Sequence, residues 1–134
     1  MKILHMMVGL PRSGKSTEAR KLNYPIIEPD AIRRSVHGTA WRAESEPLIW
    51  GLASVMTQTL FLTGYNDVVL DATNHTKQRR QIWESPHWLI QYHIVDTPKN
   101  ICIQRARDTD QAYLIPVIER MAAQFELPLN APDC

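Results

Sequence analysis

Short apolar runs alternate with longer amphipathic stretches along most of the chain. The run from Ile3 to Val8 ends at Gly9, which is typical of a buried strand. Further strands are predicted at 25–28, 68–70 and 88–95. Helices are predicted at 15–22, 30–36, 47–63, 77–84, 98–107 and 116–125. Strands that alternate with helices predict an α/β fold with a short, mostly parallel sheet of about four strands and helices on both faces.

The longest predicted helix has an apolar repeat of its own. Leu48, Leu52, Val55, Thr59 and Leu62 recur at helical spacing, and Gly64 ends the helix. The preceding segment, 37–46, is polar and irregular. Asp30 is predicted to cap the helix at 30–36.

Residues that could bind a ligand follow the ends of the predicted strands. Gly9, Asp30, Asp71 and the segment after Val95 all follow strand ends. In open parallel sheets, ligands bind beyond the carboxyl ends of the strands. These residues are therefore expected to meet at one edge.

Residues 9–17 read Gly-Leu-Pro-Arg-Ser-Gly-Lys-Ser-Thr, a phosphate-binding loop between a predicted strand and a predicted helix. Backbone amides of such a loop and the helix N-terminus hold phosphates. Lys15 is expected to bridge the β- and γ-phosphates of ATP, and the Ser16 hydroxyl to bind Mg²⁺. The residues predicted to contact the nucleotide are Gly9, Pro11, Arg12, Ser13, Gly14, Lys15, Ser16 and Thr17. The sequence therefore predicts a three-layer sandwich of the P-loop NTPase type.

GTPases, motors and small kinases share this loop. The chain is short for a motor and has no guanine-specifying Asn-Lys-x-Asp, which favours a small kinase. In a kinase, Asp30 would accept the proton of the attacking hydroxyl. Arg33, one turn later, would pair with a phosphate of the acceptor. A helix cap with a solvated arginine is the structural alternative.

Asp71 follows an apolar strand, as a Walker B aspartate does, and is predicted to bind Mg²⁺ with Ser16. Thr73 and Asn74 offer short polar side chains to the γ-phosphate or the acceptor, and Arg79 follows on a helix. A turn and a basic helix face are the alternative. His75 is interpreted as a turn residue only.

Arg105 and Arg107 precede an irregular stretch at 108–115 that could form a lid. Arginines on a lid can neutralise transition-state charge. A solvated helix end is the alternative. Trp41 is a candidate for contact with the acceptor, whereas Trp50 is expected to pack in the core.

The composition fits one soluble domain of 134 residues, with 44% apolar residues and a net charge of +1. That charge excludes a generally basic surface for nucleic acid, although a local basic channel remains compatible with it. Cys102 and Cys134 are expected to be free thiols. No targeting or membrane segment is recognised, so we predict a cytoplasmic protein without membrane contact. The predicted domain spans 1–127 and is followed by a tail at 128–134. A homo-oligomer is compatible with this prediction.

Taken together, these motifs resemble the kinase domain of polynucleotide 5'-kinases, which includes phage-type and bacterial end-healing enzymes. The resemblance rests on the phosphate loop, Asp30-x-x-Arg33, Asp71-Ala-Thr-Asn74 with Arg79, and Cys102-x-x-Arg105 before Pro116-x-x-Ile-x-Arg-Met. It implies transfer of the γ-phosphate of ATP to a 5'-hydroxyl of DNA or RNA. It assigns Asp30 as general base, Arg33 to the acceptor phosphate and Arg105 to the ATP phosphates. Thr109 stands where the family usually has a second lid arginine, and Arg107 is the candidate replacement.

Three hypotheses follow. The first is a polynucleotide 5'-hydroxyl kinase that uses ATP and Mg²⁺, with nucleic acid 5' ends as partners. The second is a kinase for a nucleoside, a small metabolite or a modified DNA base. The third is a nucleotide-binding module without catalysis.

Overall fold

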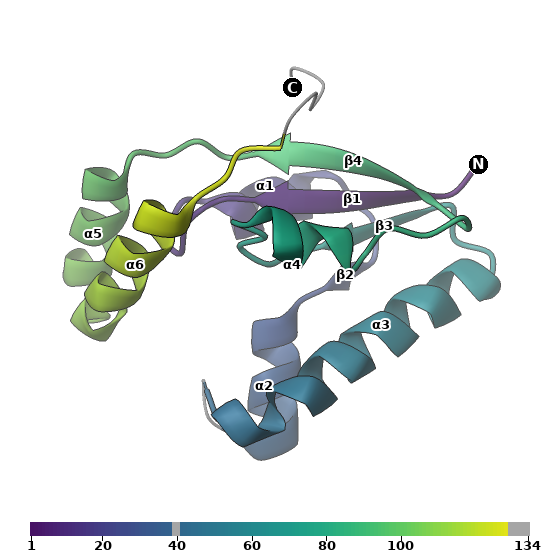
Figure 1. Ribbon diagram of the computed structural model, residues 1–134, viewed down its shortest axis with the longest axis horizontal. Helices are drawn as coiled ribbons and strands as arrows, with labels where there is room; N and C mark the ends of the chain where they lie inside the picture. The colour runs from purple at the N-terminus through teal and green to yellow at the C-terminus, as the bar shows by residue number, and fades with distance from the viewer. Residues whose placement is uncertain (39–40, 129–134) are drawn as a thin grey trace.

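The computed structural model describes residues 1–38 and 41–128. Within them, a four-stranded sheet has the order β2-β3-β1-β4, and each pairing is parallel. His5 on β1 lies level with Val69 on β3 and with Gln91 on β4. The strands are β1 (Ile3–Val8), β2 (Ile26–Ile27), β3 (Asp67–Leu70) and β4 (Leu89–Ile94). Because they are parallel, their carboxyl ends share one edge (Figure 1).

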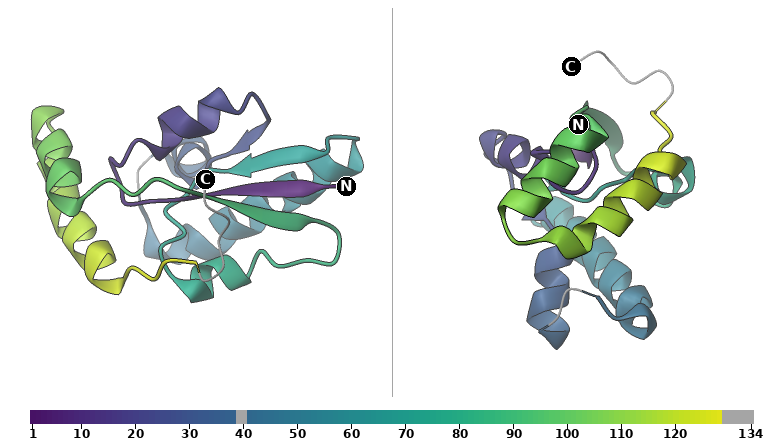
Figure 2. Two further views of the ribbon diagram at one scale, coloured as in Figure 1. Left: turned by 90° about the horizontal axis from the view of Figure 1, so that it is seen from above. Right: turned by 90° about the vertical axis from the view of Figure 1, so that its left-hand side faces the viewer.

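The helices form two layers and a separate end group. Helix α1 covers one face of the sheet, whereas α2, α3 and α4 lie on the other face (Figures 1 and 2). Helices α5 and α6 form a hairpin beyond the carboxyl ends of the strands (Figure 2). The helices are α1 (Lys15–Lys21), α2 (Pro29–His37), α3 (Glu46–Leu62), α4 (Lys77–Gln81), α5 (Lys99–Asp108) and α6 (Ile115–Gln124). The predicted three-layer α/β architecture is confirmed.

Two details differ from the sequence prediction. Helix α2 begins at Pro29, and Glu28 occupies the cap position, so Asp30 lies inside the first turn and does not cap the helix. Proline suits the first position of a helix because its missing N–H has no partner there anyway. The irregular segments also contain short 3-10 turns, η1 (Ala43–Ser45) and η2 (Ala112–Leu114).

The main core lies between the sheet and α2, α3 and α4. Alternate residues of β1 point into it, and Trp83 closes it beside α4. Helix α3 contributes the buried residues Ile49, Ala53, Thr57 and Phe61. These are not the residues whose repeat marks the helix in the sequence. On the opposite face, Met7 and Val69 pack against Ala19 of α1.

The α5–α6 hairpin has its own small core around Cys102, Ala106 and Ile118. Phe125, just after α6, packs against both this core and the main one. Cys102 is free and buried as expected, while Cys134 lies outside the described residues. None of the helices in 1–38 and 41–128 is long and apolar enough to cross a membrane.

Candidate active site at the carboxyl edge of the sheet

The backbone of the phosphate loop leaves little room at its start. A Cβ atom on Gly9 would lie 2.7 Å from Ser13 Oγ and 3.0 Å from the carbonyl oxygen of Val95. Gly14 has a φ of 97°, a left-handed conformation that favours glycine. Arg12 also has a positive φ, of 66°. Both glycines of the motif are therefore required by packing and backbone conformation.

Three neighbouring segments hold this loop by hydrogen bonds to its backbone. The Thr97 hydroxyl donates to the carbonyl oxygen of Ser13 at 2.7 Å. The amide of Gly9 donates to the carbonyl oxygen of Thr73 at 3.1 Å. Arg105 donates from Nη1 to the carbonyl oxygen of Arg12 at 3.2 Å. Arg105, expected on a lid, thus reaches the phosphate loop from α5.

Lys15 begins α1 and is half-buried beside the loop, with Nζ 3.4 Å from the carbonyl oxygen of Leu10. Burial lowers the pKa of Lys15, and the charges of Asp71 and Asp30 offset part of that shift. Those two carboxylates come from different strand ends, so their joint action on Lys15 supports the predicted convergence. A triphosphate placed beside this ammonium would stabilise its charged form.

Ser16 and Asp71 lie where a metal ion would be expected. The Ser16 hydroxyl donates to Asp71 Oδ2 at 2.7 Å, whereas the buried Oδ1 has no partner among the described residues. In 1–38 and 41–128, no group of three or more His, Cys, Asp or Glu side chains could hold a metal. Mg²⁺ in phosphotransferases needs few protein ligands, because phosphates and water complete its shell. One hydroxyl and one carboxylate with a free oxygen therefore fit Mg²⁺.

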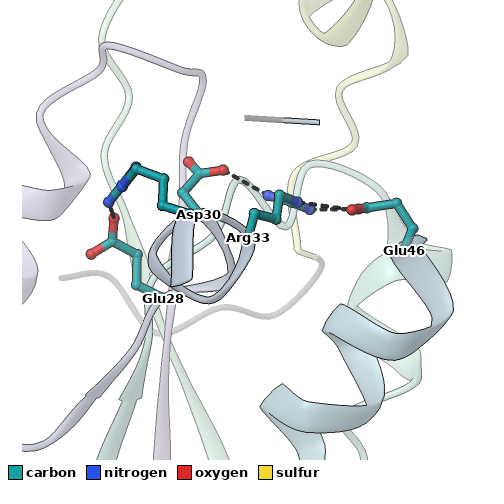
Figure 3. Close-up of polar contacts among 5 residues, drawn as sticks. Glu28, Asp30, Arg33 and Glu46 are labelled. Atoms are coloured by element: carbon teal, nitrogen blue, oxygen red, sulfur yellow. Dashed lines mark hydrogen bonds and ion pairs between the residues drawn. The ribbon is translucent and has the colours of Figure 1, made fainter. Parts of the chain in front are cut away.

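Asp30 and Arg33 face each other on α2, and Glu46 joins them from the start of α3 (Figure 3). Arg33 donates from Nη1 to Asp30 Oδ1 at 2.6 Å. Its Nε and Nη2 donate to both oxygens of Glu46, at 2.9 and 2.6 Å. The side chain of Asp30 is 65% exposed, whereas those of Arg33 and Glu46 are 11% and 13% exposed. Arg33 therefore links an open carboxylate to a shielded one.

The second carboxylate changes the electrostatics of Arg33. Burial alone would lower the pKa of Arg33, but the hydrogen bonds and charges of Glu46 and Asp30 raise it overall. One guanidinium between two carboxylates leaves the group net negative. Arg33 thus stays charged, and its charge is balanced within the protein.

Aromatic rings surround this arginine. The guanidinium of Arg33 lies 5.5 Å from the ring centre of Trp41 and 5.9 Å from that of Trp50. Arg79 lies 5.3 Å from the centre of Trp50. Trp41 is 59% exposed, while Trp50 is partly buried and packs against the main core. Trp50 therefore borders the site as well as the core.

The segment after Asp71 is braced by its own polar groups. Asn74 is buried, and its Nδ2 donates to the carbonyl oxygen of Met7 at 2.7 Å. The Thr73 hydroxyl lies 3.3 Å from His75 Nδ1, and buried Arg80 donates to the carbonyl oxygen of Asn74 at 2.9 Å. The structure thus gives Asn74 a bracing contact with β1, and its role toward substrate stays a prediction.

Arg107 does not share the position of Arg105. The two residues are about 200° apart around α5, so they project on different sides of the helix. Thr109 is close to the side of Arg105, and its hydroxyl donates to the carbonyl oxygen of Arg105 at 2.8 Å. Among the remaining predicted nucleotide contacts, Pro11 lies in the loop and Thr17 is exposed on α1.

Sequence reasoning missed Glu46 and Arg80. Glu46 lies 13 residues after Arg33, on another helix, so no local spacing indicates their contact. Arg80 follows Arg79 in the sequence and on local pattern alone fits a basic helix face, whereas in the structure it is only 5% exposed. Trp83, an apolar residue one turn after Arg80 that is itself buried, is a weak sequence signal that this side of the segment is buried.

Comparisons with known proteins agree with the fold described above. A component of the Pnkp1/Rnl/Hen1 RNA repair complex matches with a TM-score of 0.69 and 16% identity, over 93% of this chain and 46% of that one. A second structure of the Pnkp1/Rnl/Hen1 complex matches with a TM-score of 0.70 and 25% identity, over 78% of this chain and 38% of the other. The chain thus spans less than half of these proteins.

A gluconokinase from Sinorhizobium meliloti 1021 matches with a TM-score of 0.62 and 20% identity, over 96% of this chain and 77% of that one. No curated protein sequence matches. The family described as an AAA domain, AAA_33, matches residues 4–128. The chain therefore belongs to this AAA domain family, as a P-loop domain of the kinase type.

Proposed function

We propose that the protein transfers the γ-phosphate of ATP to a hydroxyl group, with Asp30 as the general base. The observation that carries this proposal is the exposed carboxylate of Asp30, which Arg33 holds at 2.6 Å and whose charge acts on Lys15. A nucleotide-binding module without catalysis does not need an oriented carboxylate beside its phosphate lysine.

The proposed reaction is a direct transfer. The acceptor oxygen forms a bond to the γ-phosphorus, and its proton passes to Asp30. The bond from that phosphorus to the β–γ bridging oxygen breaks, and ADP leaves. Arg33 occupies Oδ1, so we assign the proton to Oδ2. Because the side chain is 65% exposed, water can then remove the proton.

Lys15 and Arg105 would stabilise the charge that develops on the phosphates. Arg105 already reaches the backbone of the loop, so a small movement of α5 would bring it to a bound triphosphate. Ser16 and Asp71 would hold Mg²⁺, which would supply further positive charge to the phosphates.

For the acceptor, we propose the 5'-hydroxyl of DNA or RNA. The Pnkp1/Rnl/Hen1 structures are of an RNA repair complex, and exposed Trp41 offers a surface on which a base could stack. Arg33 is already balanced by two carboxylates, so we assign the acceptor phosphate to Arg79. The guanidinium of Arg79 is exposed and lies over Trp50.

A second candidate acceptor is a small hydroxyl compound, a nucleoside or a modified base. The gluconokinase match covers a larger part of both chains than the repair proteins do. The negative Asp30, Arg33 and Glu46 group would also accept an uncharged acceptor more readily than a phosphorylated one.

Labelled ATP decides between these acceptors. The protein is incubated with 5'-hydroxyl DNA and RNA oligonucleotides, with nucleosides, with gluconate and with DNA containing hydroxymethylated bases. Transfer to oligonucleotide ends supports the first candidate, and transfer only to small compounds or modified bases supports the second. ATP binding without transfer to any of them contradicts the kinase proposal.

A further inference from the structure

Helix α3 has a second apolar face, most of which no residue in 1–38 or 41–128 covers. Leu48, Val55 and Leu62 are 53%, 60% and 82% exposed. They repeat every seven residues, which is close to two helical turns, so they share one side of the helix. That side lies opposite the buried residues of α3. These large side chains lie on one line, and within the part of the chain that the structure describes they form an uncovered apolar surface.

The spacing is that of a helix that packs against another helix. Leu52 and Thr59 lie between the three exposed residues, giving alternating steps of four and three. Thr59 is exposed, whereas Leu52 is half-buried at the edge of this face and also packs against the main core. This pattern, with an apolar seam of two heptads, is the one that pairs helices in coiled coils. We call Leu48, Leu52, Val55, Thr59 and Leu62 the α3 seam.

The absence of charge along α3 is equally unusual. The sequence from Pro47 to Asn66 contains no Lys, Arg, Asp or Glu. A helix on the surface of a protein normally carries charged residues on its outer face. A helix that lies on a membrane carries basic residues on its polar face, and α3 has none. The outer face of α3 is therefore suited to another uncharged protein surface.

We propose that the α3 seam is the interface between two copies of this chain, packed antiparallel about Val55. A twofold axis there places Val55 against Val55 and Leu48 against Leu62 at both ends, so one surface complements itself. No like charges oppose this pairing, and the net charge of +1 gives little repulsion between copies. Gly51 beside the seam has open space around it, which allows close approach.

The pairing would leave both acceptor sites open. Glu46 begins α3 on the side that faces Arg33, and the seam lies on the other side of the helix. Dimerisation and the proposed phosphotransfer are therefore separable. Variants of the seam are expected to lose association while ATP binding stays unchanged.

The test is the mass of the full chain in solution, measured by sedimentation over a concentration series. The wild type is expected to shift from one to two chains as concentration rises. Val55→Glu is expected to weaken association about a hundredfold or more, because it places two carboxylates face to face. Ile82→Glu is the control, since Ile82 is exposed to the same extent, 61%, on another part of the surface.

A pair of double variants tests the orientation. Leu48→Glu with Leu62→Glu puts like charges together at both ends and is expected to be monomeric. Leu48→Lys with Leu62→Glu places opposite charges together only when the helices run antiparallel, and is expected to regain a dimer. Circular dichroism and ATP binding confirm that each variant is folded. A wild type that stays monomeric at every concentration, or a dimer insensitive to Val55→Glu, overturns the proposal.

Discussion

The phosphate loop is held by hydrogen bonds to its backbone, whereas Asp30 is held by ion pairs between side chains. On the donor side, Thr97, Thr73 and Arg105 fix the course of the chain between Gly9 and Gly14. On the acceptor side, Arg33 joins Asp30 to Glu46 across two helices. In the proposed reaction, the site built from backbone would hold the triphosphate, which many enzymes share. A side-chain-built site can change with few substitutions, which suits recognition of different acceptors.

Lys15→Ala is expected to have the largest effect, because in the proposed reaction Lys15 supplies the positive charge at the transferred phosphate. We expect transfer to fall by roughly a hundredfold to a thousandfold or more. The measurement is labelled phosphate on the best acceptor at saturating ATP. An unchanged rate would show that Lys15 is not part of the donor side.

Asp30→Asn tests the acceptor side at its centre. The amide keeps the size of the side chain but cannot take a proton, so transfer should fall roughly a hundredfold to ten-thousandfold. ATP binding, measured by calorimetry, should stay the same because Asp30 belongs to the acceptor side. Loss of ATP binding together with activity would remove the distinction between the two sides.

Gly9→Ala measures how rigid the donor side is. Its methyl group would meet Ser13 Oγ and a carbonyl oxygen, so we expect a loss of about 1–3 kcal/mol in the free energy of unfolding. Urea unfolding measures this value. Exposed Ile82→Ala is the control, and a change within about 0.5 kcal/mol is expected there. Equal effects would mean that the loop is not tightly packed.

Arg79→Ala tests how the acceptor phosphate is bound. We expect KM for a 3'-phosphorylated nucleoside or oligonucleotide to rise about fivefold to tenfold, with little change for the same acceptor without that phosphate. Arg20→Ala is the matched control, because Arg20 is also an exposed helical arginine and has no assigned role in the site. A similar loss for both acceptors would contradict a phosphate contact.

The pH dependence of ATP affinity should show the smallest effect. Burial lowers the pKa of Lys15 in the free protein, and the triphosphate should raise it in the complex. Affinity is therefore full below the lowered pKa and falls as pH rises from there toward the pKa of the complex. Calorimetry in two buffers should show proton uptake on binding in that range. Binding without proton uptake at every pH would contradict this account.

The fold and the donor side were predictable because their signals are local. The phosphate loop occupies nine consecutive residues, and each strand is a short apolar run that ends in a chemically distinctive residue. Parallel pairing of the strands is then enough to predict that Asp71 lies beside the loop. The hydrogen bond between Ser16 and Asp71 is the observed result.

The acceptor side was predictable only in part. The spacing of Asp30 and Arg33 indicated a pair on one helix face, and the structure shows that pair. The contact with Glu46 depends on how α2 packs against α3, which no local pattern specifies. The seven-residue repeat of α3 was visible in the sequence, but whether that face is buried depends on which side the sheet occupies. Long-range packing therefore determines both the contact of Arg33 with Glu46 and the choice of the buried face of α3.

The common direction of the four strands has a practical consequence for handling the protein. Met1 is 88% exposed and lies at the amino end of β1, where the chain begins in Figure 1. Gly9 and Asp71 follow the carboxyl ends of β1 and β3, at the opposite edge of the sheet. A fluorescent label or an affinity tag joined to Met1 would therefore sit well away from ATP and acceptor. Immobilising the protein through that end should leave both substrates free to enter, which makes it the natural attachment point for single-molecule or surface-based assays.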